Sequence, residues 1–203
     1  MDRLVFFSDA VFAIAMTLLI VELHVPAVHD TGLGPALLEL LPGYLTFILS
    51  FVVVGMVWMS HHRKFRVIVR HDQNLVRLNL VLLLFVASIP LPTGILASYG
   101  NQNLSVYIYA GTISLVGFLL TGLWIYAWHR NFVDPELSID VFRYVLVQSF
   151  PIPGIFLLSI LLAMVAGPTV AETSWVLAIP LSSAIVRIYR VRSAHASSAG
   201  GPS

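Results

Sequence analysis

Long apolar runs alternate with short polar breaks along the chain, and this pattern predicts six membrane-spanning helices. A helix needs about 20 apolar residues to cross the hydrocarbon core of a bilayer. The stretches that reach this length are residues 4–24, 36–60, 78–98, 104–128, 143–166 and 173–190. The pattern therefore predicts an all-α membrane domain over residues 1–192. Residues 193–203 are mostly serine, alanine and glycine, which predicts a disordered tail.

The composition supports a chain that is embedded in lipid along its whole length. Of its 203 residues, 58% are hydrophobic and only 10% are charged, whereas soluble domains carry about 25% charged residues. The chain has no cysteine, which excludes disulfides and cysteine-ligated metals. A formal net charge of +1 gives no indication of a nucleic-acid partner. We expect the lipid bilayer as its environment, no nucleic acid and no cofactor.

The positions of the basic residues predict how the chain is oriented. All eleven lie before the first stretch, between the second and third, between the fourth and fifth, or at the end of the sixth. They are Arg3, Arg63, Lys64, Arg66, Arg70, Arg77, Arg130, Arg143, Arg187, Arg190 and Arg192. None lies in the loops 25–35, 98–103 or 167–172. Because basic loops stay in the cytoplasm, we expect a multi-pass protein of the cell membrane with both termini and the tail cytoplasmic.

A cleaved signal peptide is the competing interpretation of the first stretch. That stretch is as long as a full span, however, and it contains Asp9. No A-x-A cleavage site follows the apolar run before His24. These features favour a retained membrane span.

The first span carries polar side chains where a plain anchor would have none. Ser8 and Asp9 lie near its beginning and Thr17 near its middle. Ionisable groups inside a membrane are costly and usually functional. At about 100° per residue, Asp9 points about 140° away from Ile14. The carboxylate and the apolar side of this helix therefore serve different surfaces.

An apolar stripe on this helix is centred on Ile14, and Thr17 lies about 60° to one side of it. The other members, all within about 40° of Ile14, are Phe7, Leu18 and Val21. Apolar stripes at helical spacing are common in ordinary helix packing and at lipid-facing surfaces. Periodicity alone leaves open whether this stripe lines a pathway or packs in this ordinary way.

Polar and aromatic residues gather at the end of the second span. Trp58 is three residues before His61 and four before His62, so one histidine shares the face of the tryptophan. The residues of the first span at the same end of the bundle are Arg3, Ser8 and Asp9. Anchoring at the membrane interface is one interpretation, and a network that joins the two spans is another. Adjacent histidines diverge by about 100°, which disfavours a shared metal ion.

The partner of Asp9 stays open at this point. A carboxylate half-buried in protein stays ionised only when it is paired. The candidates at the same end are Arg3, one of the two histidines, and Arg77. With a histidine partner, the pair would titrate near neutral pH.

The first span resembles the first helix of the transmembrane protein 175 family, the potassium channels of lysosomes and endosomes with their prokaryotic relatives. The likeness is carried by Arg3 followed by Phe7, Ser8 and Asp9, and by the apolar run after them. It extends to the end of the second span, Trp58 to Arg63. Six spans in one chain are similar to the prokaryotic form of the family, which assembles as a homotetramer.

This resemblance implies a potassium-permeable channel, with a modest preference for K⁺ over Na⁺, whose pore is lined by the first helix. The family's narrowest position falls on Ile14, and further apolar rings fall on Leu18 and Val21. Thr17 matches a polar position used for selectivity, so K⁺ in transit would pass Ile14 and Thr17. No carbonyl filter of the TVGYG type is present. The family implies that Arg3, Phe7, Ser8, Asp9, Trp58, His61 and His62 belong to the cytoplasmic-end network.

Two other classes of function compete with a channel. A secondary transporter or proton-coupled carrier would use broken helices, and Pro-x-Pro pairs do interrupt the third and fifth spans. No carboxylate lies deep in either span, so we expect simple kinks there. A membrane-embedded hydrolase would need Ser8, Asp9 and His61 as a triad. No strand-turn-helix elbow surrounds Ser8, and we expect no enzyme activity.

Overall fold

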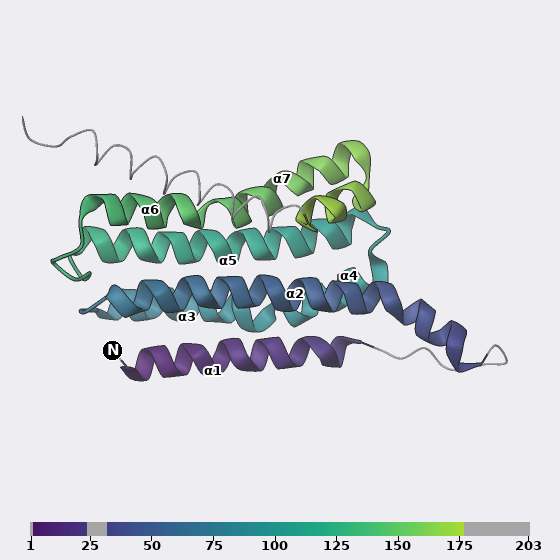
Figure 1. Ribbon diagram of the computed structural model, residues 1–203, viewed down its shortest axis with the longest axis horizontal. Helices are drawn as coiled ribbons and strands as arrows, with labels where there is room; N and C mark the ends of the chain where they lie inside the picture. Colours follow the sequence, from purple (N-terminus) through teal and green to yellow (C-terminus); the bar gives the residue numbers. More distant parts are fainter. Residues whose placement is uncertain (1, 24–31, 177–203) are drawn as a thin grey trace, which may run out of the picture.

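The computed structural model describes residues 2–23 and 32–176, and these are almost entirely helical. The helices are α1 (Asp2–Leu18), η1 (Leu19–Glu22), α2 (Leu33–Val67), α3 (Gln73–Ser88), α4 (Pro90–Tyr99), α5 (Asn103–His129), α6 (Ile139–Ser149) and α7 (Pro151–Ala166). A further helical stretch covers residues 168–176. The long helices lie side by side along the longest axis, with α1 at one edge and α6 and α7 at the other (Figure 1).

Helices long and apolar enough to cross a membrane account for the first five predicted stretches. They are Asp2–Glu22, Leu33–Val67, Gln73–Tyr99, Asn103–His129 and Ile139–Ala166. The prediction of an all-α membrane fold is therefore confirmed. Most of the sixth predicted stretch, 173–190, and the whole predicted tail, 193–203, lie outside the described residues.

Two of the spans are broken by proline, as the sequence predicted. Within the third span, α3 ends at Ser88 and α4 begins at Pro90. Within the fifth, α6 ends at Ser149 and α7 begins at Pro151. Proline has no backbone N–H and crowds the preceding turn of a helix. The breaks therefore follow from local chemistry.

Helix α5 is the central packing element of the described bundle. Its residues Tyr109 and Trp124 are completely buried, and α2, α3, α4, α6 and α7 all contact it. The Tyr109 hydroxyl lies 2.9 Å from the Ser50 hydroxyl of α2, which lies 3.1 Å from that of Thr93 in α4. At Gly117, a Cβ atom would come within 2.8 Å of the Pro153 ring. The absence of a side chain at Gly117 therefore permits the close approach of α5 and α7.

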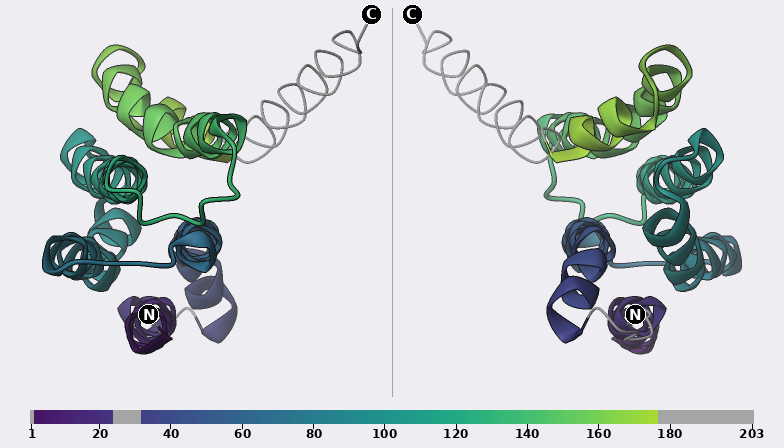
Figure 2. Two further views of the ribbon diagram at one scale, coloured as in Figure 1. Left: turned by 90° about the vertical axis from the view of Figure 1, so that its left-hand side faces the viewer. Right: turned by 90° about the vertical axis from the view of Figure 1, so that its right-hand side faces the viewer.

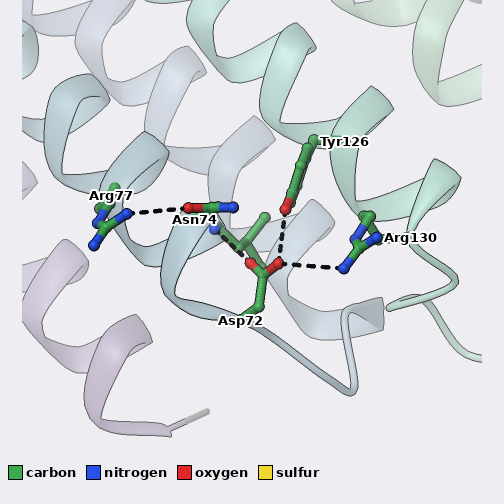
Figure 3. A network of polar contacts seen from close by, with 6 residues as sticks. Asp72, Asn74, Arg77, Tyr126 and Arg130 are labelled. Atoms are coloured by element: carbon green, nitrogen blue, oxygen red, sulfur yellow. Dashed lines mark hydrogen bonds and ion pairs between the residues drawn. The ribbon is translucent and has the colours of Figure 1, made fainter.

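The loops at the end of the bundle where α2 meets α3 are tied together around Asp72 (Figure 3). Its carboxylate accepts hydrogen bonds from the Tyr126 hydroxyl at 2.7 Å and from the Leu75 backbone N–H at 2.8 Å. The second bond caps the N-terminus of α3. Arg130 lies 3.9 Å from the same carboxylate. We call these contacts the Asp72 clasp; they join α3 to the end of α5.

The Asp72 clasp should make stability depend on pH in the acid range. The Tyr126 hydrogen bond, with help from the Leu75 N–H and Arg130, holds the pKa of Asp72 below its ordinary value. A carboxyl group with a lowered folded-state pKa stabilises the fold above its unfolded pKa, and this contribution is lost as the pH falls through the folded pKa. We therefore expect Asp72→Asn to lower the thermal midpoint at pH 7 and to have less effect near pH 3.

The measurement is thermal unfolding of both proteins in detergent at the two pH values. Asp140→Asn is the matched control, because Asp140 is an exposed carboxylate at the same end of the bundle. Asp72→Ala should lower the thermal midpoint at pH 7 more than Asp72→Asn does, since alanine also removes the cap of α3. If Asp72→Asn lowered the thermal midpoint equally at pH 7 and at pH 3, the ionised carboxylate would not be what stabilises the fold.

Candidate functional site

Helix α1 is attached to the rest of the bundle along one face only. The residues of α1 and η1 that are buried recur at spacings of three and four, as one face of a helix requires. They are Ser8, Phe12, Ala15 and Leu19. This face packs against α2, α3 and α4, and Figure 2 shows α1 at the edge of the described helices. The opposite face of α1 packs against no other helix of the described residues.

The stripe predicted from the sequence lies on this exposed face. Ile14 is 58% exposed, Leu18 is 44% exposed and Val21 is 65% exposed. Phe7 and Thr17 are exposed with them. The stripe is therefore not part of the packing between the described helices of one chain. Lipid or another copy of the chain can therefore contact this stripe.

Thr17 has the geometry to offer an oxygen to a cation. Its hydroxyl donates a hydrogen bond to the backbone carbonyl of Ile14, at 2.9 Å. Because the hydroxyl proton is used within the helix, the lone pairs of the oxygen remain for another partner. The side chain lies on the exposed face with Ile14.

A chain of hydrogen bonds joins the buried face of α1 to α2 and α3. The Asn79 amide nitrogen donates to the Ser8 hydroxyl at 3.0 Å, and Ser8 donates to the Leu4 carbonyl at 2.8 Å. The Asn79 amide oxygen lies 2.9 Å from Nε2 of His61. With the amide in this orientation, His61 donates from Nε2. Ser8, His61 and Asn79 are all fully buried.

The structure gives Asp9 a partner that the sequence did not suggest. The indole N–H of Trp58 donates to the Asp9 carboxylate at 2.8 Å. None of the expected partners, Arg3, Arg77 or a histidine, forms a salt bridge with Asp9: within residues 2–23 and 32–176, the only salt bridge is that of the Asp72 clasp. Arg3 is exposed at the beginning of α1. Asp9 is thus held by an uncharged donor.

The two histidines have different surroundings. His61 stacks on Phe65 with ring centroids 4.1 Å apart and lies 5.4 Å from the ring of Phe12. The ring of His62 lies 5.7 Å from that of Trp58, so His62 is the histidine on the tryptophan's side. In the described part of the chain, no group of three or more His, Asp or Glu side chains is placed to hold a metal ion.

The hydrolase interpretation finds no triad geometry. Ser8 gives its proton to the Leu4 carbonyl and accepts from Asn79, so it is not hydrogen-bonded to a histidine base. Asp9 contacts Trp58 and does not orient His61. A nucleophilic serine needs a base within hydrogen-bond reach that is itself oriented by a third group.

Asn79 is the member of this network that the sequence did not assign to it. An asparagine in an apolar span predicts a hydrogen bond between helices, of a kind that is common in membranes, but not its partner. The available signal was its position near the basic end of that span, at the depth of Ser8 and His61. The spacing within one helix does not reveal which polar side chains on other helices it meets.

Comparisons with known proteins bear on what this arrangement does. The sequence profile of the family described as "Endosomal/lysosomal potassium channel TMEM175" matches residues 3–90. A potassium channel of Streptomyces collinus is 34% identical over 183 residues, which cover 85% of this chain and 87% of that protein. A potassium channel of Chamaesiphon minutus is 38% identical over 131 residues, which cover 62% of this chain and 64% of that protein.

The fold matches a solved channel structure over nearly its whole length. The crystal structure of a lysosomal potassium-selective channel TMEM175 homolog from Chamaesiphon minutus superposes with a TM-score of 0.71 and 29% sequence identity. The match covers 95% of this chain and 97% of the other. A zebrafish relative named as an endosomal/lysosomal proton channel is 26% identical over 64% of this chain and 26% of its own length.

A bundle of long apolar helices with these relatives defines an ion channel of the helical membrane class. The chain belongs to the TMEM175 family, as the resemblance of its first helix predicted. Its class of activity is therefore ion transport through the membrane, and the family is not a class of enzymes. The roles of the individual residues in the site stay predictions.

Asn79 should contribute more to stability than a solvent- or lipid-facing hydroxyl. Replacing it with leucine leaves the Nε2–H of His61 and the Ser8 hydroxyl oxygen buried without their partner. Each unsatisfied group costs about 1–3 kcal/mol. We expect Asn79→Leu to lower the free energy of unfolding by at least that amount.

Denaturant unfolding of the purified protein in detergent measures this effect. Thr112→Val is the control, because Thr112 is only half-buried and its hydroxyl bonds to the carbonyl one turn before it. The loss of unfolding free energy in Trp58→Phe should lie between those of Asn79→Leu and Thr112→Val, since this change removes one hydrogen bond at a partly exposed site. If Asn79→Leu lowered the free energy of unfolding no more than Thr112→Val does, the network would have no structural role.

Proposed function

We propose that four copies of the chain assemble with the exposed faces of their α1 helices around a common axis, forming a potassium-permeable pore. The observation that carries this proposal is that the apolar stripe of α1 is exposed in the chain, while the opposite face is tied to α2 and α3. Relatives of this chain are named potassium channels. The number of four follows from the resemblance to the prokaryotic members of the family.

In this assembly the stripe forms rings of apolar side chains. Ile14 and Val21 are separated by two turns, about 10 Å along the helix. Rings of Ile14, Leu18 and Val21 narrow enough to remove water from an ion impose a dehydration cost, and they also allow gating by dewetting. Potassium holds its water less tightly than sodium, so this barrier favours potassium. Without many oxygen ligands the preference is modest.

Thr17, which lies beside the stripe, also supports a preference for K⁺ over Na⁺. Its hydroxyl oxygen has free lone pairs because the proton is bonded to the Ile14 carbonyl. A ring of such oxygens replaces part of the hydration shell of a passing cation. The expected permeant ion near Ile14 and Thr17 is therefore dehydrated K⁺, with no resident metal or cofactor.

The buried network sets which face of α1 meets the axis. One residue corresponds to about 100° of rotation around a helix, so a slip by a single residue would replace Ile14 at the axis. The Ser8–Asn79 and Asp9–Trp58 hydrogen bonds attach α1 to two different helices. We assign this end of the assembly to the cytoplasmic side. The role that we propose for Arg3, Phe7, His61 and His62 is to complete the contacts between α1 and α2 there.

Substitutions in the stripe should change ion selectivity. Ile14→Asn places a polar ring at the constriction, which no longer forces dehydration, so we expect Na⁺ and K⁺ to pass at similar rates. Thr17→Ala removes a ring of hydroxyl oxygens and should lower the K⁺/Na⁺ ratio by about two- to fivefold, the equivalent of a weak hydrogen bond. The measurement is K⁺ and Na⁺ flux from liposomes. Leu84→Asn, a change at an exposed position of α3, is the control, and equal ratios in all four proteins would contradict the assignment.

Single cysteines test the position of α1 directly, because the chain has no cysteine of its own. If α1 surrounds the axis, Ile14→Cys should form disulfide-linked dimers under mild oxidation, and thiol-reactive cations should block its current. Leu84→Cys on α3 should do neither. Disulfides require Cα atoms within about 7 Å, so crosslinking at Leu84 but not at Ile14 would place α1 away from the axis.

Current recordings from the wild type separate a channel from the alternative, a secondary transporter or proton-coupled carrier. A pore gives discrete current steps, whereas a carrier moves ions too slowly for single events to be seen. Stepwise currents that reverse near the K⁺ equilibrium potential support the channel. Flux without steps that depends on a proton gradient would favour the carrier.

A further inference from the structure

A cavity of about 330 Å³ lies between α2 and the pair formed by α5 and α6, away from the stripe of α1. Its volume equals that of about ten water molecules in the liquid, at about 30 Å³ each. Side chains from four helices line it. The hydroxyl protons of Thr121 and Ser149 are bonded to backbone carbonyls of their own helices, and the lining side chains that keep donor groups for a ligand are Ser60, Arg63, Lys64 and Gln148. The network of α1 uses none of these four side chains.

Lys64 is the feature of this cavity that requires an explanation. It is only 2% exposed, and its ammonium group donates to the Ser60 hydroxyl at 2.7 Å. Lys64 forms no ion pair with any described carboxylate, and no Asp or Glu lines the cavity. Charged side chains inside membrane proteins almost always pair or face a polar cavity. A buried lysine with one neutral partner therefore has capacity for an anion.

Four side chains of the cavity wall can donate hydrogen bonds to a ligand. The Ser60 oxygen accepts from Lys64, which leaves the hydroxyl proton free to bind a ligand. Lys64 retains two further N–H groups, and the Gln148 amide and the Arg63 guanidinium add others. Several donors around one positive centre without a carboxylate fit a group with several anionic oxygens, and phosphate is such a group.

The lining is graded along α2. Arg63 and Lys64 lie nearest the end of the helix, whereas Met56 and Val57 lie about 10 Å deeper in the span. Ile152 of α7 adds a further apolar side chain. A phospholipid has the same order, with a phosphate near the membrane surface and acyl chains below it. Basic pockets between helices on the cytoplasmic side bind anionic head groups by this principle.

We propose that this cavity between α2, α5 and α6 binds a phosphate group through Lys64, Ser60 and Gln148, supplied by the head group of an anionic phospholipid. Arg63, which is exposed, adds charge to the site. The site is separate from the pore assigned to α1, so a bound lipid would act on how α2 packs against α5 and α6. Free phosphate shares the chemistry of the ligand, and the experiment distinguishes the two sources.

The test uses the purified, delipidated wild-type assembly in detergent. Phosphatidylglycerol, phosphatidylcholine and inorganic phosphate are titrated separately, and binding is followed by native mass spectrometry and by the shift in thermal midpoint. We expect phosphatidylglycerol to bind more tightly than phosphatidylcholine. Lys64→Met preserves most of the side-chain volume and should weaken phosphatidylglycerol binding by about tenfold to a hundredfold, as for a charged hydrogen bond.

The matched control is Arg66→Met, which removes an exposed basic residue of α2 that does not line the cavity. It should change the affinity by less than about threefold, as for surface charges. Gln148→Leu provides a second variant if Lys64→Met does not fold, and it should weaken binding severalfold without changing the charge. Lys64→Arg should retain most of the binding.

Each outcome decides the proposal. Loss of binding in Lys64→Met or Gln148→Leu, but not in Arg66→Met, supports it. Tight binding of inorganic phosphate that displaces the lipid and depends on Lys64 supports the phosphate site and assigns free phosphate as its source. Equal binding of the two lipids overturns it, and so do equal losses in Lys64→Met and Arg66→Met. A carboxylate of a neighbouring subunit bound to Lys64 in the assembled channel would overturn it as well.

Discussion

The arrangement of this chain depends on the need to satisfy polar side chains inside a membrane. No water is available there to hydrogen-bond a buried hydroxyl, amide or imidazole, and an unsatisfied group is costly. Ser8, Asn79 and His61 are fully buried and form one continuous chain of hydrogen bonds across three helices. Few other positions of α1 would keep these three side chains hydrogen-bonded to one another. The contacts therefore fix both the depth and the rotation of α1. Apolar packing alone is less directional and would tolerate rotation of α1 about its own axis.

The same constraint explains why the two sides of α1 differ. Small and aromatic side chains, with Phe12 lying against His61, fill the side that carries the network. The other side is apolar and exposed. Such a face can contact lipid, and it can also contact other copies of the chain in an assembly. Elsewhere in the bundle, the hydroxyls of Ser50, Thr93 and Tyr109 meet in a similar buried group. Polar contacts thus set the register of helices whose apolar surfaces are nearly interchangeable.

The features that the sequence predicted correctly are those that depend on local pattern. The first five spans, the breaks at Pro90 and Pro151 and the exposure of the stripe on one face follow from hydrophobic runs, the proline ring and the helical period. The partner of Asp9 could not be predicted in this way. Charge considerations favoured the cations at the same end, whereas the hydrogen bond comes from the uncharged indole of Trp58. The burial of Lys64 likewise depends on how α2 is placed among the other helices, which no single helix encodes.

Three charged side chains at the basic end are accommodated in three different ways. Asp72, outside the spans, is held by a hydroxyl, a backbone N–H and an arginine, and its surroundings favour the ionised form. Asp9, inside a span, has a single neutral donor and remains partly exposed. Lys64 is more deeply buried than either, and its hydroxyl partner carries no charge. Since the cost of a buried charge rises as its compensation falls, Lys64 is the least compensated of these three charges. An anion or a neighbouring subunit at this position would remove that cost, and the donor-rich wall of the cavity favours the anion.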